Sequence, residues 1–257
     1  MNVVWLGFLA SLIAGSVTGL GSLGVFLVRK LSIKLEDGLL SFSAGIMLAA
    51  SFFSLLLPAI DHGEQYFGSE HMAVVAAIGG MLAGAAVLYF MHCYLPHEHF
   101  VTGPEGPEAT TLSRIWLFVI AITLHNFPEG MAVGVGFANG DINNGTVLAT
   151  GIGIQNIPEG LAVSISMLVI GYSRLKAFFV GLLTGLVEPV GGLVGSVAVS
   201  FAGPLMPLAL AFAAGAMLFV ISDEIIPETH RRGFETLATF SLLVGFALMM
   251  YLDTTLG

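Results

Sequence analysis

Long apolar runs separated by short polar segments dominate the chain. A helix needs about 20 mostly apolar residues to cross the hydrocarbon core of a bilayer, and windows of that size predict eight such helices. The predicted spans are Val3–Val28, Gly38–Ile60, Met72–Leu95, Arg114–Ala138, Thr146–Tyr172, Leu175–Ser200, Pro204–Ile226 and Phe234–Leu252. The pattern therefore predicts an all-α integral membrane protein, with residues 1–257 forming a single transmembrane domain.

The basic residues predict how the spans are oriented. All eight Lys and Arg residues fall in alternate loops, so an extra or missing span would break the alternation. They are Arg29, Lys30 and Lys34 after span 1, Arg114 before span 4, Arg174 and Lys176 between spans 5 and 6, and Arg231 and Arg232 between spans 7 and 8. Because cytoplasmic loops carry the excess of Lys and Arg, both termini are predicted to lie outside.

The first apolar run and the longest connection each allow two interpretations. The first apolar run has no basic residue before it, and Arg29 and Lys30 follow it, so it is predicted to be a retained helix and not a cleaved signal peptide. The longest connection, 96–113, is predicted to be a cytoplasmic loop. Its His97 and His99 flank a glutamate, which indicates either a flexible loop or a weak metal-gathering tract.

Two sequence repeats link spans that run in opposite directions. The nine residues from His125 to Val133 recur from Gln155 to Val163, with six identical, and these segments lie in spans 4 and 5. The stretch Phe42–Leu48 is echoed by Phe212–Leu218 in spans 2 and 7. Such pairs indicate inverted-topology repeats, which occur in secondary transporters with the substrate site near the midplane. We predict three helices, a central pair, then three helices.

Composition and charge agree with a membrane protein. Of the 257 residues, 56% are hydrophobic and 10% are charged, against about 25% charged in soluble domains. Eight scattered basic residues cannot form a phosphate-neutralising patch, so no nucleic acid partner is expected. The single cysteine, Cys93, excludes an internal disulfide and a multi-thiolate metal site.

Four ionisable residues lie at membrane depth with no basic residue at a matching depth. They are His125 and Glu129 in span 4, Glu159 in span 5 and Glu188 in span 6. Ionisable groups are costly in a membrane and are by default candidates for function. Carboxylates in such a medium, with no Lys or Arg nearby, hold either a proton or a cation.

The spacing of these residues favours a cation. His125 and Glu129 are four residues apart and share a helix face, with Asn126 beside them, and span 5 repeats the arrangement with Gln155, Asn156 and Glu159. Pro128 and Pro158 lack N–H groups, which frees the carbonyls of Leu124 and Ile154. The nitrogen and oxygen donors suit zinc, and also iron(II), manganese, cobalt, nickel and cadmium. The alternative is that two polar helices pack through hydrogen bonds.

Other polar residues near the span ends carry weaker signals. Asp61 and Asp253 are predicted on the external side, either as a cation entrance or as solvated helix ends. Asp223, Glu224, Glu228 and His230 cluster near the cytoplasmic end of span 7, as an exit site or as a hydrated helix end.

The doubled motif resembles that of the ZIP metal-ion transporters, and its Gln-Asn form resembles the bacterial GufA-like branch. The resemblance covers nearly the whole chain. It implies a binuclear metal site, with His125, Glu129, Gln155 and Glu159 at the first position. Asn126, Asn156 and Glu188 would serve the second position, with Glu129 and Glu159 bridging. Some members have an aspartate where this chain has Asn156, so the second position loses one charge here.

The resemblance also implies import of zinc and related metals, cadmium, iron(II), manganese and cobalt among them, across the bacterial inner membrane. Many members are dimers, and an elevator-like motion of some helices is described for the family. Divalent metal ions are then transported substrates, no cofactor is expected, and the lipid bilayer is the other partner.

Three competing functions remain open on the sequence. An intramembrane metalloprotease would need a His-Glu-x-x-His helix, which the spacing of His125 and Glu129 does not give. A passive metal channel would share the same site and differ in rate. A purely structural membrane protein is disfavoured by the glutamates that lack basic partners.

Overall fold

The computed structural model describes residues 2–94, 97–99, 103–105, 114–137, 140–169, 171–201 and 205–256. Its α-helices are α1 (Val3–Ser22), α2 (Ile33–Ala50), α3 (Leu57–Phe67), α4 (Glu70–Tyr94), α5 (Arg114–Gly136), α6 (Ile142–Val169), α7 (Arg174–Gly185), α8 (Glu188–Phe201), α9 (Met206–Val220), α10 (Ile226–Thr229) and α11 (Glu235–Leu256). The predicted loop 96–113 is described only where β1 (His97–His99) pairs antiparallel with β2 (Gly103–Glu105).

The described helices fit a membrane-spanning protein. Seven helical stretches are long and apolar enough to cross a bilayer, and they correspond to seven of the eight predicted spans. The remaining predicted span corresponds to α5, whose 23 residues give a helix about 35 Å long at 1.5 Å per residue. The all-α membrane fold is therefore confirmed at the level of seven to eight long apolar helices.

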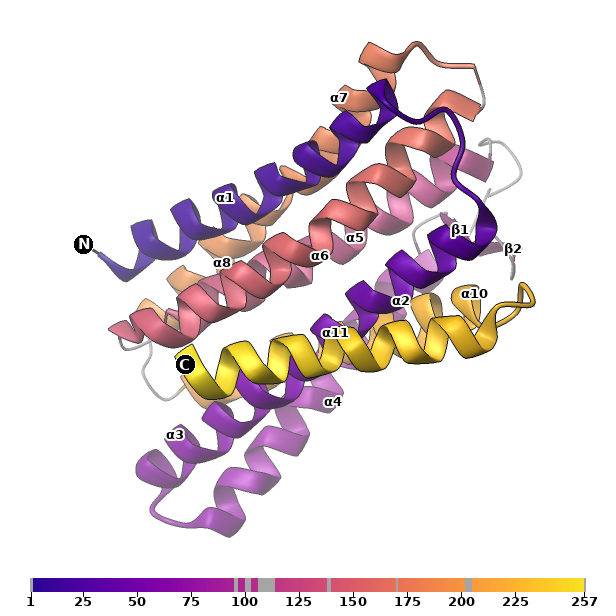
Figure 1. Cartoon of the computed structure of the whole chain (residues 1–257). Coiled ribbons are helices and arrows are strands. Elements are labelled where there is room, and N and C mark those ends of the chain that lie inside the picture. Colours follow the sequence, from indigo (N-terminus) through magenta and orange to yellow (C-terminus); the bar gives the residue numbers. More distant parts are fainter. Residues whose placement is uncertain are drawn as a thin grey trace.

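The helices form two bundles that lie side by side (Figure 1). The motif bundle consists of α1, α5, α6, α7 and α8, in which α1 packs on α6 and α8, and α5 packs on α8. The flanking bundle consists of α2, α3, α4, α9, α10 and α11, in which α2 packs on α11 and α4 packs on α9. The main contacts between the bundles run from α2 to α6 and from α5 to α9. Both chain termini lie at one end of the molecule, the terminal end (Figure 1).

Glycines set the short distances between helices within each bundle. A methyl group on Gly130 of α5 would lie 2.0 Å from the backbone oxygen of Glu188, and one on Gly160 of α6 would lie 2.0 Å from that of Thr18. In the flanking bundle, Gly45 of α2 faces the backbone oxygen of Leu242 at the same distance. Small residues let helix backbones approach closely in membranes, so each bundle is held by backbone packing.

Three spans deviate from a regular α-helix near a proline. Span 2 contains a π-helical segment, Ser51–Leu56, before Pro58, and span 7 contains another, Ile221–Ile225, before Pro227. Span 6 is predicted as one helix but is broken at residues 186–187, between α7 and α8. Pro189, four residues after Gly185, has no N–H to donate to the Gly185 carbonyl. The helix of span 2 also continues to Phe67, beyond its predicted end.

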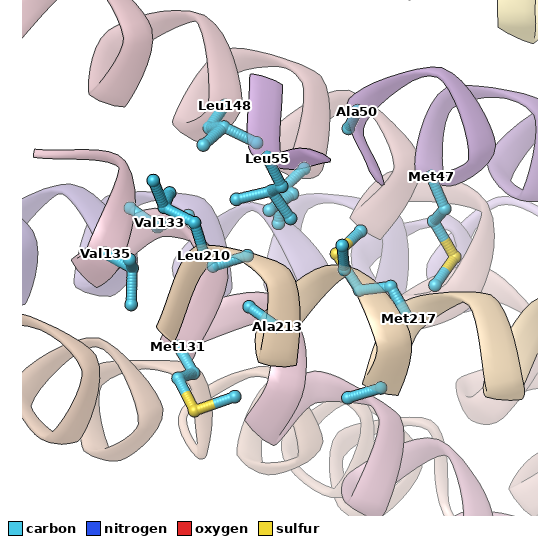
Figure 2. Packing of buried hydrophobic residues seen from close by; sticks show 14 of the residues in the cluster. Met47, Ala50, Leu55, Met131, Val133, Val135, Leu148, Leu210, Ala213 and Met217 are labelled. Atoms are coloured by element: carbon cyan, nitrogen blue, oxygen red, sulfur yellow. The ribbon is translucent and has the colours of Figure 1, made fainter. Parts of the chain in front are cut away.

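The interface between the bundles is formed largely by buried apolar side chains. Figure 2 shows Met47, Ala50 and Leu55 of span 2 and Leu210, Ala213 and Met217 of α9 packed beside Met131, Val133 and Val135 of α5 and Leu148 of α6. The longest of these side chains, such as Met47 and Met217, are flexible and fill gaps without directional bonds. Glycine-to-backbone packing joins helices within a bundle, whereas side chains fill the space between the two bundles.

The close contact between α4 and α9 gives a test of the glycine packing. A methyl group on Gly84 would lie 2.0 Å from the Phe212 backbone oxygen, while one on Gly79 of the same helix meets nothing within 4 Å. We expect Gly84→Ala to destabilise the protein by about 1–3 kcal/mol through overpacking. Gly79→Ala should be neutral or slightly stabilising, since Ala favours helix over Gly. Thermal unfolding in detergent measures both, and equal melting temperatures for the two variants would contradict the packing described here.

Candidate metal centre

The seven residues predicted as central ligands lie on three helices of one bundle and are all buried. Each is at most 4% exposed, and Glu129 and Glu188 are fully buried. The set is His125, Asn126 and Glu129 on α5, Gln155, Asn156 and Glu159 on α6, and Glu188 at the start of α8. Since α5 packs against both α6 and α8, the fold brings the repeated motifs and Glu188 to one region.

Asn156 connects α6 to two neighbouring helices. Its side-chain amide donates a hydrogen bond to the Glu188 carboxylate at 2.6 Å and another to the Ala14 carbonyl of α1 at 2.9 Å. The start of α8 is fixed because the chain leaves the helix at Gly185 and resumes it at Glu188. This break places the Glu188 carboxylate inside the bundle, where Asn156 reaches it.

The carboxylates lie close enough for their charges to interact. Glu129 is within electrostatic range of Glu159 and Glu188, and the Gln155 amide lies beside it. The backbones approach through Gly130, which rests on the Glu188 backbone. All eight Lys and Arg residues lie at the beginnings of helices or in the connections between them, so none offers a positive charge at this depth.

Several polar atoms of this group have no hydrogen-bond partner among the described residues. They are both oxygens of Glu129, both amide atoms of Asn126 and Gln155, and one oxygen each of Asn156, Glu159 and Glu188. Buried polar atoms are nearly always hydrogen-bonded, and each one left without a partner costs about 1–3 kcal/mol. The group can accept protons, water or a cation. In the described part of the chain, however, no three His, Cys, Asp or Glu side chains are arranged so that they could hold a metal ion.

His125 points across to the flanking bundle. Its Nε2 lies 2.5 Å from an oxygen of Glu224, which is 4% exposed and sits in the π-helical segment of span 7. The sequence assigned these two residues to separate groups, a central one and an exit one. The structure joins them, because Glu224 in the π-helical segment lies against His125 of α5.

The other predicted residues lie farther out. Asp61 is exposed on α3, and Asp253 of α11 accepts a hydrogen bond from the Ser54 hydroxyl. Asp223 is exposed, and His230 makes contacts with the Ile226 carbonyl and the Thr239 hydroxyl through its two ring nitrogens. His97 and His99 lie in β1, opposite Glu105 and Gly103.

Glu228 takes part in an ion-pair group at the start of α2. Arg232 donates to Glu228 and lies 3.4 Å from both Glu36 and Asp37. This group ties the turn after α10 to α2 within the flanking bundle. In the structure, Glu228 makes an ion pair that connects two segments. The sequence alone did not distinguish such a structural contact from a role in metal exit.

The space between the bundles differs at its two ends. Toward the end that carries the basic loops, a cavity of about 310 Å³ is lined by residues of α6, including Ala162 and Ser166, and by Glu36 and Arg232 of the flanking bundle. Toward the terminal end, the apolar side chains of Figure 2 fill the space. In this conformation, the centre is separated from the terminal end by packed side chains.

The family comparison decides the class of protein. The model of the family described as "ZIP Zinc transporter" matches residues 96–253. The chain belongs to the ZIP family. It is 47% identical over 253 residues to the zinc transporter GufA of Myxococcus xanthus, covering 98% of this chain and 99% of that protein.

Other relatives span bacteria and animals. The chain is 45% identical over 242 residues to the zinc transporter ZIPB of Bordetella bronchiseptica, covering 94% of this chain and 78% of that protein. It is 34% identical over 335 residues to human ZIP11, covering 99% and 98% respectively. These matches confirm a ZIP transporter of the GufA-like branch, a multi-pass membrane protein and not an enzyme.

The structure also reveals contacts that the motifs could not indicate. The Ser43 hydroxyl of α2 donates to the Gln155 carbonyl at 3.0 Å, and the Ala14 carbonyl of α1 accepts from Asn156. Ser43 and Ala14 carry no recognisable signal, because small residues are frequent in spanning helices. Only the packing of α1 and α2 against α6 brings them to the centre.

The two hydrogen bonds of Asn156 generate a prediction for the metal-free protein. Asn156→Asp removes the N–H donors and, when ionised, places a carboxylate beside Glu188 and the Ala14 carbonyl. We expect a loss of stability of about 1–3 kcal/mol in chelator at neutral pH, the cost of leaving buried acceptors without donors. The matched control is Asn143→Asp, the same change at an exposed position of α6. If both variants unfold at the same temperature in detergent, the Asn156 contacts do not stabilise the centre.

Proposed function

We propose that this ZIP-family chain carries divalent transition-metal ions, with zinc preferred, from outside the cell into the cytoplasm. The observation that carries the proposal is the group of buried carboxylates Glu129, Glu159 and Glu188, which interact with one another and have no basic residue at their depth. A divalent cation offsets such negative charge in a low-dielectric medium. The names of the relatives, zinc transporters throughout, support the same substrate.

The donor set supports a range of metals around zinc. One imidazole, three carboxylates and three amide side chains suit borderline ions, so cadmium, iron(II), manganese and cobalt are proposed as further substrates. We propose two adjacent metal positions. His125, Glu129, Gln155 and Glu159 serve the first, while Asn126, Asn156 and Glu188 serve the second, with Glu129 and Glu159 shared between them.

The metal-loaded centre requires side-chain movement. His125 pairs with Glu224, and Asn156 occupies one Glu188 oxygen. We propose that His125 coordinates the metal through Nε2, the nitrogen that faces Glu224, and that metal binding therefore draws this nitrogen away from Glu224. The metal is released toward the cytoplasm when His125 pairs with Glu224 again. Glu224 therefore contributes to metal exit and is also a partner of the central residues.

The arrangement of the bundles supports an alternating-access cycle. The helix pairs α1 with α6 and α5 with α8, together with α2 with α11 and α4 with α9, match a pseudo-two-fold relation between spans 1–3 and 6–8. The two π-helical segments begin at Ser51 and Ile221, each three residues after the end of the repeated stretch in spans 2 and 7. We propose inverted repeats, with the terminal end outside the cell and the basic loops in the cytoplasm of a bacterium.

The first test concerns the central carboxylates. Glu129→Ala or Glu159→Ala should reduce zinc uptake into proteoliposomes to the background of empty vesicles, because each removes a ligand shared by both positions. The isosteric Glu129→Gln removes the charge but keeps the volume of the side chain, and it should lower zinc uptake as much as Glu129→Ala does. Glu64→Gln, at an exposed position of α3, is the matched control and should transport normally. Wild-type uptake by a properly inserted Glu129→Ala protein would rule out the assignment.

The second test counts protons and metals. Ligands must be deprotonated to coordinate, so metal binding releases protons and weakens as the pH falls. We expect more than one proton released per zinc at neutral pH, and up to two metals bound per chain. Calorimetric titration in buffers of different ionisation enthalpy gives both numbers. A proton count near zero would mean that the glutamates are already ionised without metal, against the low-dielectric centre proposed here.

A further inference from the structure

Asn144 lies where the two bundles meet near the terminal end. It sits in the first turn of α6, and its backbone N–H donates to the Asp141 side chain at 3.0 Å. Asp141 therefore caps the helix and holds the backbone of Asn144 in place. The Asn144 side chain is partly buried and free to make contacts outside its own helix.

The Asn144 side chain donates to a backbone carbonyl in the π-helical segment of span 2. Its Nδ2 lies 3.2 Å from the Ser54 carbonyl oxygen in the flanking bundle and 3.5 Å from the Gly136 carbonyl at the end of α5. Ser54 lies in the π-helical segment Ser51–Leu56, four residues before Pro58, where backbone hydrogen bonding departs from the regular α-helical pattern. Asn144 thus makes a side-chain hydrogen bond to this backbone across the interface.

The acceptor is held firmly on its own side. The Ser54 hydroxyl donates to the Asp253 carboxylate of α11, which anchors this part of span 2 within the flanking bundle. Asn144 is anchored by its helix cap and by Gly136 in the motif bundle. The hydrogen bond from Asn144 to Ser54 therefore joins the two bundles.

Around this contact, the described interface offers little other polar attachment. The cross-bundle contacts of Ser43 with Gln155 and of His125 with Glu224 lie at the level of the centre. On the terminal side, the neighbours are apolar, among them Leu55, Val133 and Leu148 (Figure 2). Contacts between apolar side chains close the space between the bundles, but they are not directional and so allow several relative positions. A hydrogen bond requires one geometry and therefore favours one relative position of the two bundles.

We infer that Asn144 is a positioning residue that latches the terminal end of the transport path closed, an inference that rests on the alternating-access function proposed above. Its hydrogen bond is made when the path is sealed on the terminal side and is broken when the bundles move apart there. The net strength of one such bond corresponds to roughly a fivefold change in the closed-to-open ratio. That bias is small enough for the cycle to overcome at every turnover.

Thiol accessibility in the detergent-purified full chain tests the latch. Cys93 is the single cysteine of the chain, so Cys93→Ser gives a thiol-free background. Ala50→Cys, fully buried among the apolar side chains, reports opening on the terminal side. Ser166→Cys, in the cavity at the other end, reports the opposite side. Each is combined with Asn144→Asp, which keeps the shape but loses the donor when ionised, and with Asn144→Leu, which has neither donor nor charge.

We expect both Asn144 variants to raise the maleimide labelling rate at Ala50→Cys by roughly fivefold, the bias expected of one hydrogen bond, without raising the rate at Ser166→Cys. Asn143→Asp, an exposed change of the same charge one residue away, should leave both rates unchanged. An unaltered rate at Ala50→Cys, an equal rise at both cysteines, or the same effect from Asn143→Asp would each overturn the latch. Because labelling needs no transported ion, a failed latch is distinguishable from a failure of metal uptake.

Discussion

The constraint on which the structure depends is the burial of three carboxylates at membrane depth without a basic residue near them. Glu129, Glu159 and Glu188 are fully or almost fully buried and interact with one another. An isolated buried charge is far too costly to persist, so the surrounding helices must supply donors or the centre must take a proton or cation. Asn156 supplies one donor to Glu188, and many other polar atoms of the group have none among the described residues.

That constraint explains why the motif bundle is tied together by glycine and proline. Gly130 and Gly160 bring α5, α6, α8 and α1 into backbone contact, which places short polar side chains within reach of one another. Pro128 and Pro158 interrupt the hydrogen bonding of α5 and α6 beside the glutamates. Glycine and proline, which destabilise a helix in a soluble protein, here bring the residues of the centre together.

The contrast between the two kinds of packing is compatible with the proposed movement of one bundle against the other. Backbone-to-glycine contacts hold each bundle as a unit, because a helix cannot slide past a backbone contact without losing it. Flexible side chains such as Met47 and Met217 fill the space between the bundles, and they can repack at little cost. The few polar contacts across the interface, including Asn144 with Ser54 and His125 with Glu224, therefore decide which relative position is preferred.

The sequence by itself determined the spans, the alternation of basic loops and the seven buried residues of the centre. Hydropathy over 20 residues, i and i+4 spacing and a repeated motif are local signals, and membrane burial makes them strong. The break at Gly185, the π-helical segments, the pairing of His125 with Glu224 and the bond from Asn144 to Ser54 were decided only by tertiary structure. Each depends on which helices pack side by side, and the residues that then form contacts are distant in sequence.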